Sequence, residues 1–524
     1  MLSGRAETRR LAPPRIMFAL LAAATVALSA CSSASTSSSA AGGATQTLTV
    51  GIVEAPLSLD PSSGAAGPYT PMLFLAYSPL IALSPSGQLV PGLATSWHYV
   101  GSGNTNFELT LRQNARFADG TPVNAAAVKA WFEYNAKSPA ETASLGVLKS
   151  VQTTGDWTVD IQLATPNPEI PLILASNWGM VGSPAGVAKP SLLAGGTAGG
   201  AGPYQVVPSQ TVIGTQYTYV PNKYYYDKST IKYGKVVVKI ITSGSSLLQA
   251  AETGEVDAAY GSSLTAAAAA AGGLKVYSAQ SGVNQLVFTD LNGTVQKALG
   301  NVTVRQALNM AIDRSAIVQG IVGKYGSPTS EPELGPGYVP GLDNYYPYNP
   351  QKAKALLASA GYPNGFTISV VSWVDPSVGS TILDAVAKYL AAVGVTLKIY
   401  QPPTGSDFVT ATASKGTYTG AQILTNIGGT GSSAVEDYQD WLSPTSILNV
   451  YKSTDPTLGG LYSQALQASN PLPLEQAMIQ REVTQADTLP IYKYEFIWYV
   501  GKNVGGFQMS NGNPQPDIAQ WYPA

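Results

Sequence analysis

The chain has 524 residues, enough for several hydrophobic cores, and 45% of them are apolar, which excludes a disordered protein. Charged residues make up only 11%, well below the roughly 25% usual for a soluble domain, and the formal net charge is −2. Such a chain offers no basic surface of the kind that nucleic-acid binding requires, so we expect no nucleic-acid partner.

Residues 1–30 have the pattern of a secretory signal peptide. Four arginines precede an apolar run, Ile16 to Leu28, which is short for a membrane span of about 20 residues. Leu28-Ser29-Ala30-Cys31 resembles a bacterial lipobox, and Cys31 is the only cysteine of the chain. We therefore predict cleavage before Cys31, a lipid on its thiol, and anchorage to the outer side of the cytoplasmic membrane, at the cell surface or in the periplasm. Residues 31–47, rich in Ser, Ala and Gly, are expected to form a flexible tether.

Hydrophobic periodicity in the first half of the remaining chain predicts alternating strands and helices. We expect strands at 47–53, twice within 150–163, at 217–220 and at 235–241. Helices are expected at 126–136, at 246–252 and at 266–271, where six alanines are followed by two glycines. Asn124 has the position of an N-cap for the first of these helices.

The second half continues the alternation. Strands are predicted at 284–290, 366–372, 396–400 and, just after Pro490, at 491–500; helices are predicted at 303–319, 350–360 and 381–393. Strands that alternate with helices at this spacing favour an α/β fold.

Several segments, taken in order, resemble the family-5 extracytoplasmic solute-binding proteins of ABC importers, the group of oligopeptide-, dipeptide- and nickel-binding proteins. The similar segments are Leu59-Asp60-Pro61, Gly87 to Trp97, Leu111 to Val123, Gly202-Pro203-Tyr204, Pro221 to Tyr225, Gly254 to Asp257, Val304 to Arg314 and Pro350 to Tyr362. Each segment is weak alone, but together they follow the family order over most of the mature chain.

The resemblance implies a two-lobed periplasmic-binding-protein fold, type II and cluster C, with a hinge and an extra inserted subdomain. Lobe one would comprise residues 48–283 and 495–524, with the inserted subdomain at about 85–200, and lobe two residues 284–494. The implied function is capture of a peptide or similar small polar solute between the lobes and its delivery to an ABC permease and ATPase, by a monomer that needs no cofactor. A ligand-presenting sensor or a surface interaction protein on the same fold is the alternative.

Most of the similar motif residues also have a structural explanation. Asp119-Gly120 is a turn sequence, and Asp257 fits a turn or a cap. Arg305, Asp313 and Arg314 would lie on one helix, where an ion pair that stabilises the lobe explains them better than ligand contact.

The sequence gives little support to an enzymatic function. The single histidine, His98, lies within a motif of the fold, and there is no Gly-x-Ser-x-Gly segment and no phosphate-binding loop. Glu436 and Asp437 are adjacent, which does not suit a glycosidase pair that must face each other across a bond. One histidine and one cysteine are too few for a zinc site, so we expect no catalytic residue and no metal.

The ligand site is predicted from Glu436 to Leu442, which resembles the family segment D-D-P-D-N-F-L with Tyr438 in place of proline. Peptide-binding members commonly carry an aspartate three residues before the second one, where it pairs with the peptide α-ammonium; that place falls here on Ala434. Either Glu436 or Asp437 substitutes for it, or the ligand lacks a free amine. Further ligand-binding candidates are aromatic or amide residues after strands or turns: Trp373, Asn426, Tyr69, Asn177 and Trp178.

Overall fold

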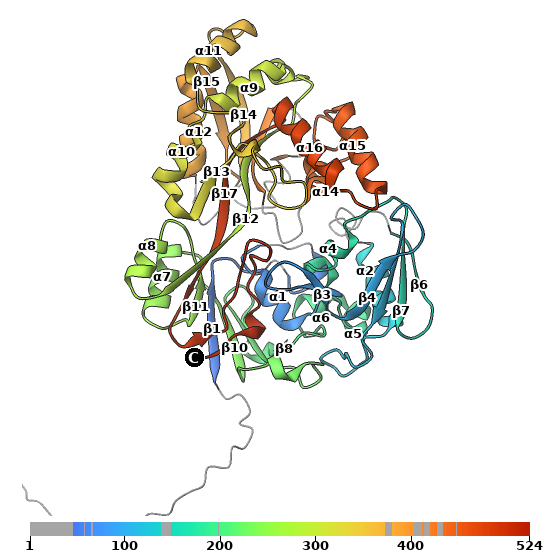
Figure 1. The fold of residues 1–524 in the computed structure, drawn as a ribbon. Coiled ribbons are helices and arrows are strands. Elements are labelled where there is room, and N and C mark those ends of the chain that lie inside the picture. Colours follow the sequence, from blue (N-terminus) through green and yellow to red (C-terminus); the bar gives the residue numbers. More distant parts are fainter. Residues whose placement is uncertain are drawn as a thin grey trace, which may run out of the picture. The chain divides into compact units, whose positions relative to one another are not determined.

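The computed structural model describes residues 46–524 except 57, 64–66, 138–147, 198, 373–379, 403–410, 413–419, 427–432 and 447. Within this part of the chain strands and helices alternate, so the predicted α/β class is confirmed (Figure 1). Most strands belong to one mixed sheet of 11 strands with the order β15-β14-β16-β12-β17-β11-β1-β10-β9-β8, and β13 pairs with β17 beside this path.

One end of the sheet forms the group that we call lobe one. Its strands are β1 (Thr47–Ile52), β8 (Tyr204–Val206), β9 (Gln216–Pro221), β10 (Lys235–Ile240) and β11 (Ala258–Tyr260). Its helices are α1 (Thr70–Ala76), α7 (Gly244–Glu252) and α8 (Ala266–Ala271). Strand β1 runs parallel to both β10 and β11, and its side chains Leu48, Val50 and Ile52 are buried in the core.

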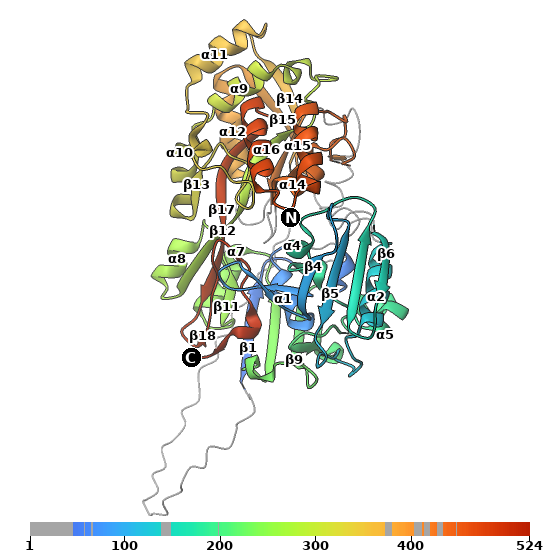
Figure 2. The ribbon, with the colours of Figure 1, turned by 45° about the vertical axis from the view of Figure 1, so that its right-hand side comes forward.

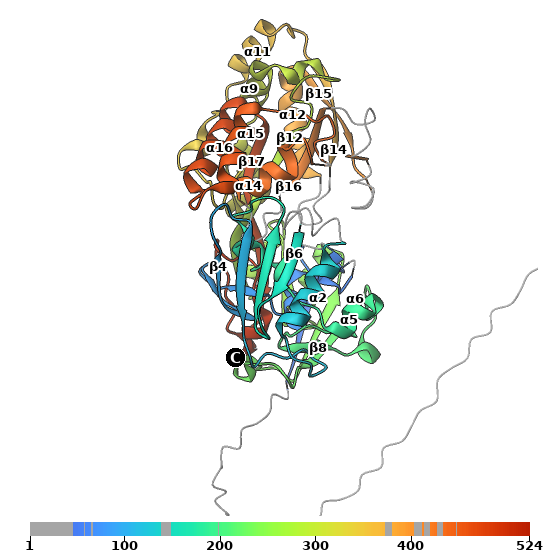
Figure 3. The same cartoon turned by 90° about the vertical axis from the view of Figure 1, so that its right-hand side faces the viewer.

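A smaller antiparallel sheet with the order β4-β5-β7-β6 has a hydrophobic core of its own. Its strands are β4 (Ala94–Tyr99), β5 (Asn106–Leu111), β6 (Leu148–Thr153) and β7 (Thr158–Leu163). Helix α2 (Ala125–Asn135) packs against β6 and β7 (Figure 3), and Asn124 caps it by accepting the N–H of Ala127 at 3.0 Å, as predicted. The same core includes the hairpin β2 (Ile81–Leu83) and β3 (Leu89–Pro91) and the short helices α4 (Ile170–Ile173), α5 (Pro184–Ala188) and α6 (Pro190–Ala194).

The other end of the large sheet forms lobe two. Its strands are β13 (Gly326–Pro328), β14 (Phe366–Ser372), β15 (Val395–Tyr400) and β16 (Gly420–Asn426). Its helices are α9 (Val302–Met310), α10 (Arg314–Ile317), α11 (Pro350–Ser359), α12 (Thr381–Ala392), α14 (Ala434–Asp437), α15 (Pro456–Gln467) and α16 (Leu472–Gln485). Helices α15 and α16 pack against each other, and both contact α14 (Figure 2).

Two long strands, β12 (Lys275–Phe288) and β17 (Thr488–Val500), pair with each other and connect the two lobes. Strand β17 also pairs with β11 through residues 498–500 and with β13 through residues 492–494, whereas β12 pairs with β16 from Val283 onward. Between these contacts, residues 278–280 pair with 495–497, and no third strand of the described chain joins them. A register shift between Gln280 and Gly282 adds a bulge at this narrow part of the sheet.

Three predicted element boundaries are wrong for identifiable reasons. The helix expected at 303–319 ends at Met310, because Asp313 caps a new helix, α10, by accepting the N–H of Ala316 at 2.9 Å. The strand expected at 284–290 begins earlier, at Lys275. The strand expected after Pro490 runs through this proline, which lies beside a register shift of its partner strand and so requires no regular ladder bond.

The motif from Val304 to Arg314 stabilises lobe two. The buried guanidinium of Arg305 donates to the carbonyl oxygens of Leu299, Gln485 and Ala486 and pairs with Asp487 at 3.1 Å. Arg314 donates to Pro490 and to other backbone oxygens nearby. The expectation of one helix with an ion pair among Arg305, Asp313 and Arg314 is therefore wrong: Asp313 and Arg314 begin a separate helix, and the ion pair of Arg305 is made with Asp487, outside the motif.

Candidate functional site

Helix α14 presents several carboxyl groups toward the boundary between the lobes. Ser433 caps this helix by accepting the N–H of Glu436. Asp437 is buried, while Glu436 and, one turn later, Asp440 are half-buried. Glu436 and Asp437 lie on α14 and Asp440 on the π-helical turn that continues it, so their carboxyls lie close enough to repel one another electrostatically.

A loop that precedes α11 adds a fourth carboxyl. Glu333 is 2% exposed, and its carboxylate accepts the backbone N–H groups of Leu334 and Gly335 at 2.6 Å each. The same loop contacts α14 directly, since the N–H of Ala434 donates to the carbonyl oxygen of Pro336 at 3.1 Å. Burial and the nearby charge of Asp437 raise the pKa of Glu333 well above its usual value.

Two further carboxyls face each other from opposite lobes. Glu475, in the first turn of α16, belongs to lobe two, and Glu169, just before α4, belongs to the inserted part of lobe one. Both side chains are buried, with exposed fractions of 1% for Glu475 and 7% for Glu169. We name Glu169, Glu333, Glu436, Asp437, Asp440 and Glu475 the acidic cluster.

Desolvation dominates the electrostatics of this cluster. Burial, the charge of Glu169 and a hydrogen bond with it raise the pKa of Glu475 to about 8, while burial and the charge of Asp437 raise that of Asp440 to about 7. Burial, followed by the charges of Asp440, Asp437 and Glu169, raises the pKa of Glu436 well above its usual value. Part of the cluster is therefore protonated near neutral pH, and a nearby positive charge would favour its ionised form.

Ala434, at the position where peptide-binding members commonly carry an aspartate, is closely packed. Its side chain is 2% exposed and packs against the loop at Gly337, which has a positive φ of 105°. A Cβ atom on Gly337 would lie 2.9 Å from the Cβ of Ala434 and 3.3 Å from that of Glu475. This loop therefore approaches α14 and α16 too closely for a side chain at position 337.

A second contact between the lobes lies near Glu169. The side-chain amide of Asn104, in the turn between β4 and β5, donates to the carbonyl oxygens of Leu466 at 3.0 Å and Ala468 at 2.9 Å. The backbone oxygen of Asn104 accepts the N–H of Asn167, whose side chain accepts the N–H of Glu169. The turn is thus connected to the segment that carries Glu169.

The other predicted ligand residues of lobe one, Tyr69, Asn177 and Trp178, have different surroundings. Tyr69 is buried in the core of lobe one, where burial and then Glu54 raise its pKa. Trp178 packs against the core of the small sheet, and Asn177 beside it is buried with no hydrogen-bond partner for Nδ2 among the described atoms. These three positions favour packing roles for Tyr69 and Trp178.

Trp373 and Cys31 lie outside the described residues. Asn426 ends strand β16, where its backbone pairs with Val283 of β12. Strand β14, which ends one residue before Trp373, runs parallel to β16. Asn426 is thus the last residue of a strand that runs parallel to β14.

Sequence reasoning missed Glu169, Glu333 and Glu475 as well as the bridging role of Asn104. None of these residues stands in a motif with a charge pattern, and they are brought together from three separate parts of the chain. A usable indication was the scarcity of charge: in a chain with 11% charged residues, a glutamate within an apolar segment such as Glu169-Ile170-Pro171 is unusual.

The described part of the chain contains no group of side chains arranged to bind a metal ion and no nucleophile beside its histidine. No group of three or more His, Cys, Asp or Glu side chains there has the geometry to hold a metal ion. His98 is exposed on β4, and no nucleophile donates to it in the described hydrogen bonds. Among the described helices, none combines the length and the apolar character needed to cross a membrane.

Comparison with known proteins gives a consistent picture. A family model described as "Bacterial extracellular solute-binding proteins, family 5 Middle" matches residues 88–449. The glutathione-binding protein GsiB of Salmonella typhimurium is 29% identical over 321 residues, which cover 59% of this chain and 60% of that protein. The chain thus matches about three fifths of the length of this curated relative.

Solved structures agree on the fold. The binding protein AgaA in complex with agropinic acid, from A. tumefaciens R10, has a TM-score of 0.78 with 24% identity over 91% of this chain and 99% of that one. The protein DppA from Helicobacter pylori in complex with the peptide STSA has a TM-score of 0.77 with 19% identity, over 91% and 98% of the two chains. The two-lobed type II architecture expected from the sequence is confirmed by this similarity.

Proposed function

The chain belongs to the family-5 bacterial extracellular solute-binding proteins, and on that basis we propose that it is the substrate-binding lipoprotein of an ABC importer. It captures a peptide or similar small polar solute between its lobes and presents it to a membrane permease with its ATPase. The observation that carries this proposal is the acidic cluster at the lobe boundary, to which both lobes contribute. Capture between lobes that close around a ligand is a common mode of binding.

We propose the lobe boundaries expected from the sequence: 48–283 with 495–524 for lobe one, and 284–494 for lobe two, with an inserted subdomain at about 85–200. The narrow part of the large sheet, where no third strand of the described chain joins the pairing of residues 278–280 with 495–497, supports a hinge at these crossings. The separate core of the small sheet supports the inserted subdomain.

The ligand class follows from the chemistry of the cluster. A buried carboxylate is stabilised by a cation, and none of the described ion pairs involves Glu169, Glu436, Asp440 or Glu475. A ligand ammonium would supply the missing charge, with Glu436 and Asp437 acting where Ala434 carries none. Glutathione and the peptide STSA, bound by relatives, both carry such an α-ammonium group.

The remaining predicted residues take positions around this ammonium. Trp373 and Asn426 contact the rest of the ligand, which is supported by the parallel pairing of β14, ending at Ser372, with β16, ending at Asn426, while Asn177 offers an unused side-chain N–H group. No turnover accompanies binding, since the exposed His98 lacks a nucleophile and an acid partner in the described structure. The whole process is capture and release.

A thermal-shift screen tests the proposal, with each peptide tested as the free amine and as its N-acetyl derivative. A free-amine ligand at a hundredfold excess over its Kd should stabilise the chain by about 2.7 kcal/mol, and the acetylated form by much less. Glu436→Gln should weaken binding of the free amine about 10- to 100-fold, whereas Glu252→Gln, at an exposed position, should not. Equal shifts with free and acetylated peptides, or binding unaffected by Glu436→Gln, would contradict the assigned ligand class.

The lipid anchor has its own test. Cys31→Ser should release the chain from the membrane fraction or leave an uncleaved precursor, because only the thiol accepts the lipid. Intact-mass analysis of the detergent-extracted protein should show an acylated N-terminal cysteine. A mature chain with an unmodified Cys31 would contradict the anchor without affecting ligand capture.

A further inference from the structure

A cavity lies within lobe one, apart from the acidic cluster. Its volume is about 590 Å³, which falls in the range of small-molecule sites. Ala175 and three segments line it: residues 74–92 around α1 and the β2–β3 hairpin, the segment that contains Pro203 and Tyr225, and the C-terminal stretch 506–522. No lining residue belongs to lobe two, so this cavity is distinct from the proposed ligand site.

The C-terminal stretch forms a loop whose two ends are fixed. Strands β18 (Val504–Gly505) and β19 (Tyr522–Pro523) pair with each other at the base of this loop. Phe507 and the buried Trp521 pack ring against ring, with centroids 5.0 Å apart. A loop closed in this way presents its side chains without a large loss of conformational entropy on binding.

The loop is also connected to the hairpin on the far side of the cavity. Ser510 donates to the carbonyl oxygen of Pro85 at 2.5 Å, and the amide of Asn513 donates to that of Ser84 at 3.4 Å. Gly87 and Gly512 approach so closely that a Cβ on either would lie within 3.1 Å of the other's backbone. The cavity is therefore preformed between two segments that hold each other in place.

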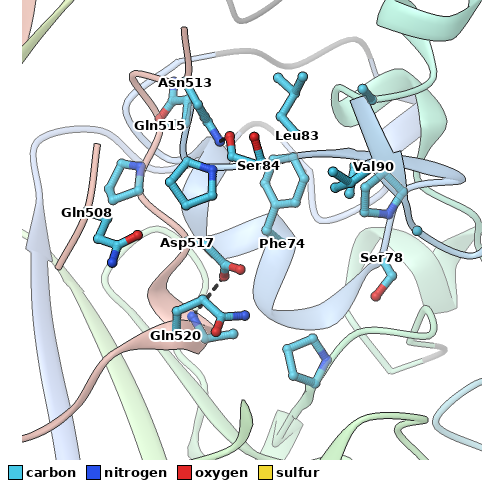
Figure 4. A pocket seen from close by; sticks show the side chains of 18 of the residues that line it. Phe74, Ser78, Leu83, Ser84, Val90, Gln508, Asn513, Gln515, Asp517 and Gln520 are labelled. Carbon is cyan, nitrogen blue, oxygen red and sulfur yellow. Dashed lines mark hydrogen bonds between the residues drawn. The ribbon is translucent and has the colours of Figure 1, made fainter. Parts of the chain in front are cut away.

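The lining combines aromatic faces with uncharged polar groups. Phe74, Tyr225 and Tyr226 line it, and the last two rings lie 4.5 Å apart between centroids. Figure 4 shows Gln508, Asp517 and Gln520, from the C-terminal loop, across the cavity from the ring of Phe74. The side chains of Gln508 and Gln520 are exposed to solvent and can each donate and accept hydrogen bonds.

The charge of the lining restricts the ligand further. Asp517 is its one carboxyl group, and no lysine or arginine lines the described cavity, which disfavours an anionic ligand. The carboxylate of Asp517 already accepts the N–H of Ala519 at 3.0 Å and a hydrogen bond from Gln520. These two neutral donors occupy acceptor sites of the single carboxylate, in contrast to the acidic cluster, where several carboxyl groups lie together.

We propose that this cavity is a binding site for an uncharged saccharide of one or two sugar rings. The apolar face of a sugar ring packs against an aromatic side chain such as that of Phe74. Its hydroxyl groups both donate and accept, and amide side chains together with a carboxylate satisfy both roles. The site neither requires nor excludes the proposed peptide ligand of the cleft.

Saturation-transfer NMR and calorimetry with the mature chain test this site, using cellobiose, maltose and N,N′-diacetylchitobiose as probes. At least one disaccharide should bind with a Kd of about 1 mM or tighter. Gln508→Leu and Asp517→Asn should each weaken that binding at least about tenfold, a factor that corresponds to 1.4 kcal/mol. Asparagine retains the capping ability of Asp517, so the second variant keeps the local fold.

Two controls separate this site from the cleft. Gln113→Leu, at an exposed glutamine outside the cavity, and Glu475→Gln, in the acidic cluster, should leave disaccharide binding unchanged. Absence of binding by all three disaccharides would overturn the proposal. Binding that is lost in Glu475→Gln but retained in Gln508→Leu and Asp517→Asn would also overturn it, because the sugar would then occupy the cleft.

Discussion

The side-chain amide of Asn104 lies between the carbonyl oxygens of Leu466 and Ala468, so that one residue of the small sheet makes two hydrogen bonds to lobe two. Asn104 has a positive φ of 50°, a conformation that asparagine and glycine adopt more readily than other residues. Backbone conformation and contact between the lobes therefore both favour asparagine at this position.

Removing this amide should weaken the closed state without unfolding the protein. Asn104→Gly keeps the backbone conformation and loses two hydrogen bonds, each contributing about 1 kcal/mol. The ligand Kd should therefore rise about 5- to 30-fold, mainly through faster dissociation measured by stopped-flow fluorescence. Asn114→Gly, at an exposed asparagine, is the matched control. An unchanged dissociation rate in Asn104→Gly would show that the contact does not hold the lobes together.

Ligand binding should release a proton at neutral pH. The pKa of Glu475 is raised to about 8 by burial and by Glu169, so this carboxyl is mostly protonated at pH 7 when the lobes are in contact and no ligand is bound. A ligand ammonium in the cluster lowers that pKa and drives ionisation. Calorimetry in phosphate and in Tris buffer should give different binding enthalpies, equivalent to release of up to about one proton per ligand. In Glu475→Gln the dependence on buffer should become smaller; proton uptake in the unmodified chain would refute the cationic ligand.

The stability of the fold should decrease as the pH rises from about 5 to about 8. Glu482 is buried, and burial, with the charges of Asp487 and Asp437, raises its pKa to about 8. The unfolded chain has a glutamate pKa of about 4.3, so the folded state holds this proton more tightly. Its stabilising effect is complete below about pH 4 and is lost as the pH rises through about 8.

Glu482→Gln tests this effect, because glutamine retains an oxygen that accepts the hydroxyl of Thr488, now 2.9 Å away. Urea denaturation of this variant should show a shallower loss of stability between about pH 5 and 8 than the unmodified chain. The exposed Glu252→Gln provides the comparison. Identical pH profiles for Glu482→Gln and the unmodified chain would contradict the assignment.

Arg305 should be among the residues whose loss most destabilises lobe two. Its replacement by methionine leaves Asp487 buried without its cation and three carbonyl oxygens without their donor. Removal of one partner of a buried pair costs about 3–5 kcal/mol, measurable by denaturant unfolding. Arg481→Ala breaks a partly exposed pair with Asp455 and should cost about 1 kcal/mol or less. Equal losses of unfolding free energy in the two variants would contradict the role of Arg305 in stabilising lobe two.

The sequence predicted the fold well because local chemistry determines most of its elements. Asn124 and the run Ala266–Ala271 specify their helices through capping and propensity, and both elements were predicted. The break after Met310 was missed because an aspartate cap inside an apolar period gives no visible interruption of that period. The early start of β12 was missed because its first residues are paired through β17, more than 200 positions away in the chain.

The candidate site was predicted only in part, for a related reason. Glu436 and Asp437 were found because they lie within a family segment, and the absence of a carboxylate at Ala434 was visible directly. Glu169 and Glu475 acquire their properties only when the two lobes meet and exclude water from them. Desolvation is a property of the folded chain, and no spacing in the sequence records it.

When the lobes rotate apart, the large sheet deforms at its narrow part, where β12 pairs with β17 without a third strand. A ladder of two strands twists more easily than a wide sheet, and the bulge after Gln280 already disturbs its register. Rotation of one lobe against the other can thus proceed as torsion of β12 with β17 while their backbone pairs stay intact. The elastic resistance of this connection is small, so the balance between open and closed forms is determined at the lobe surfaces, by the amide of Asn104 and the ionisation of Glu169 and Glu475.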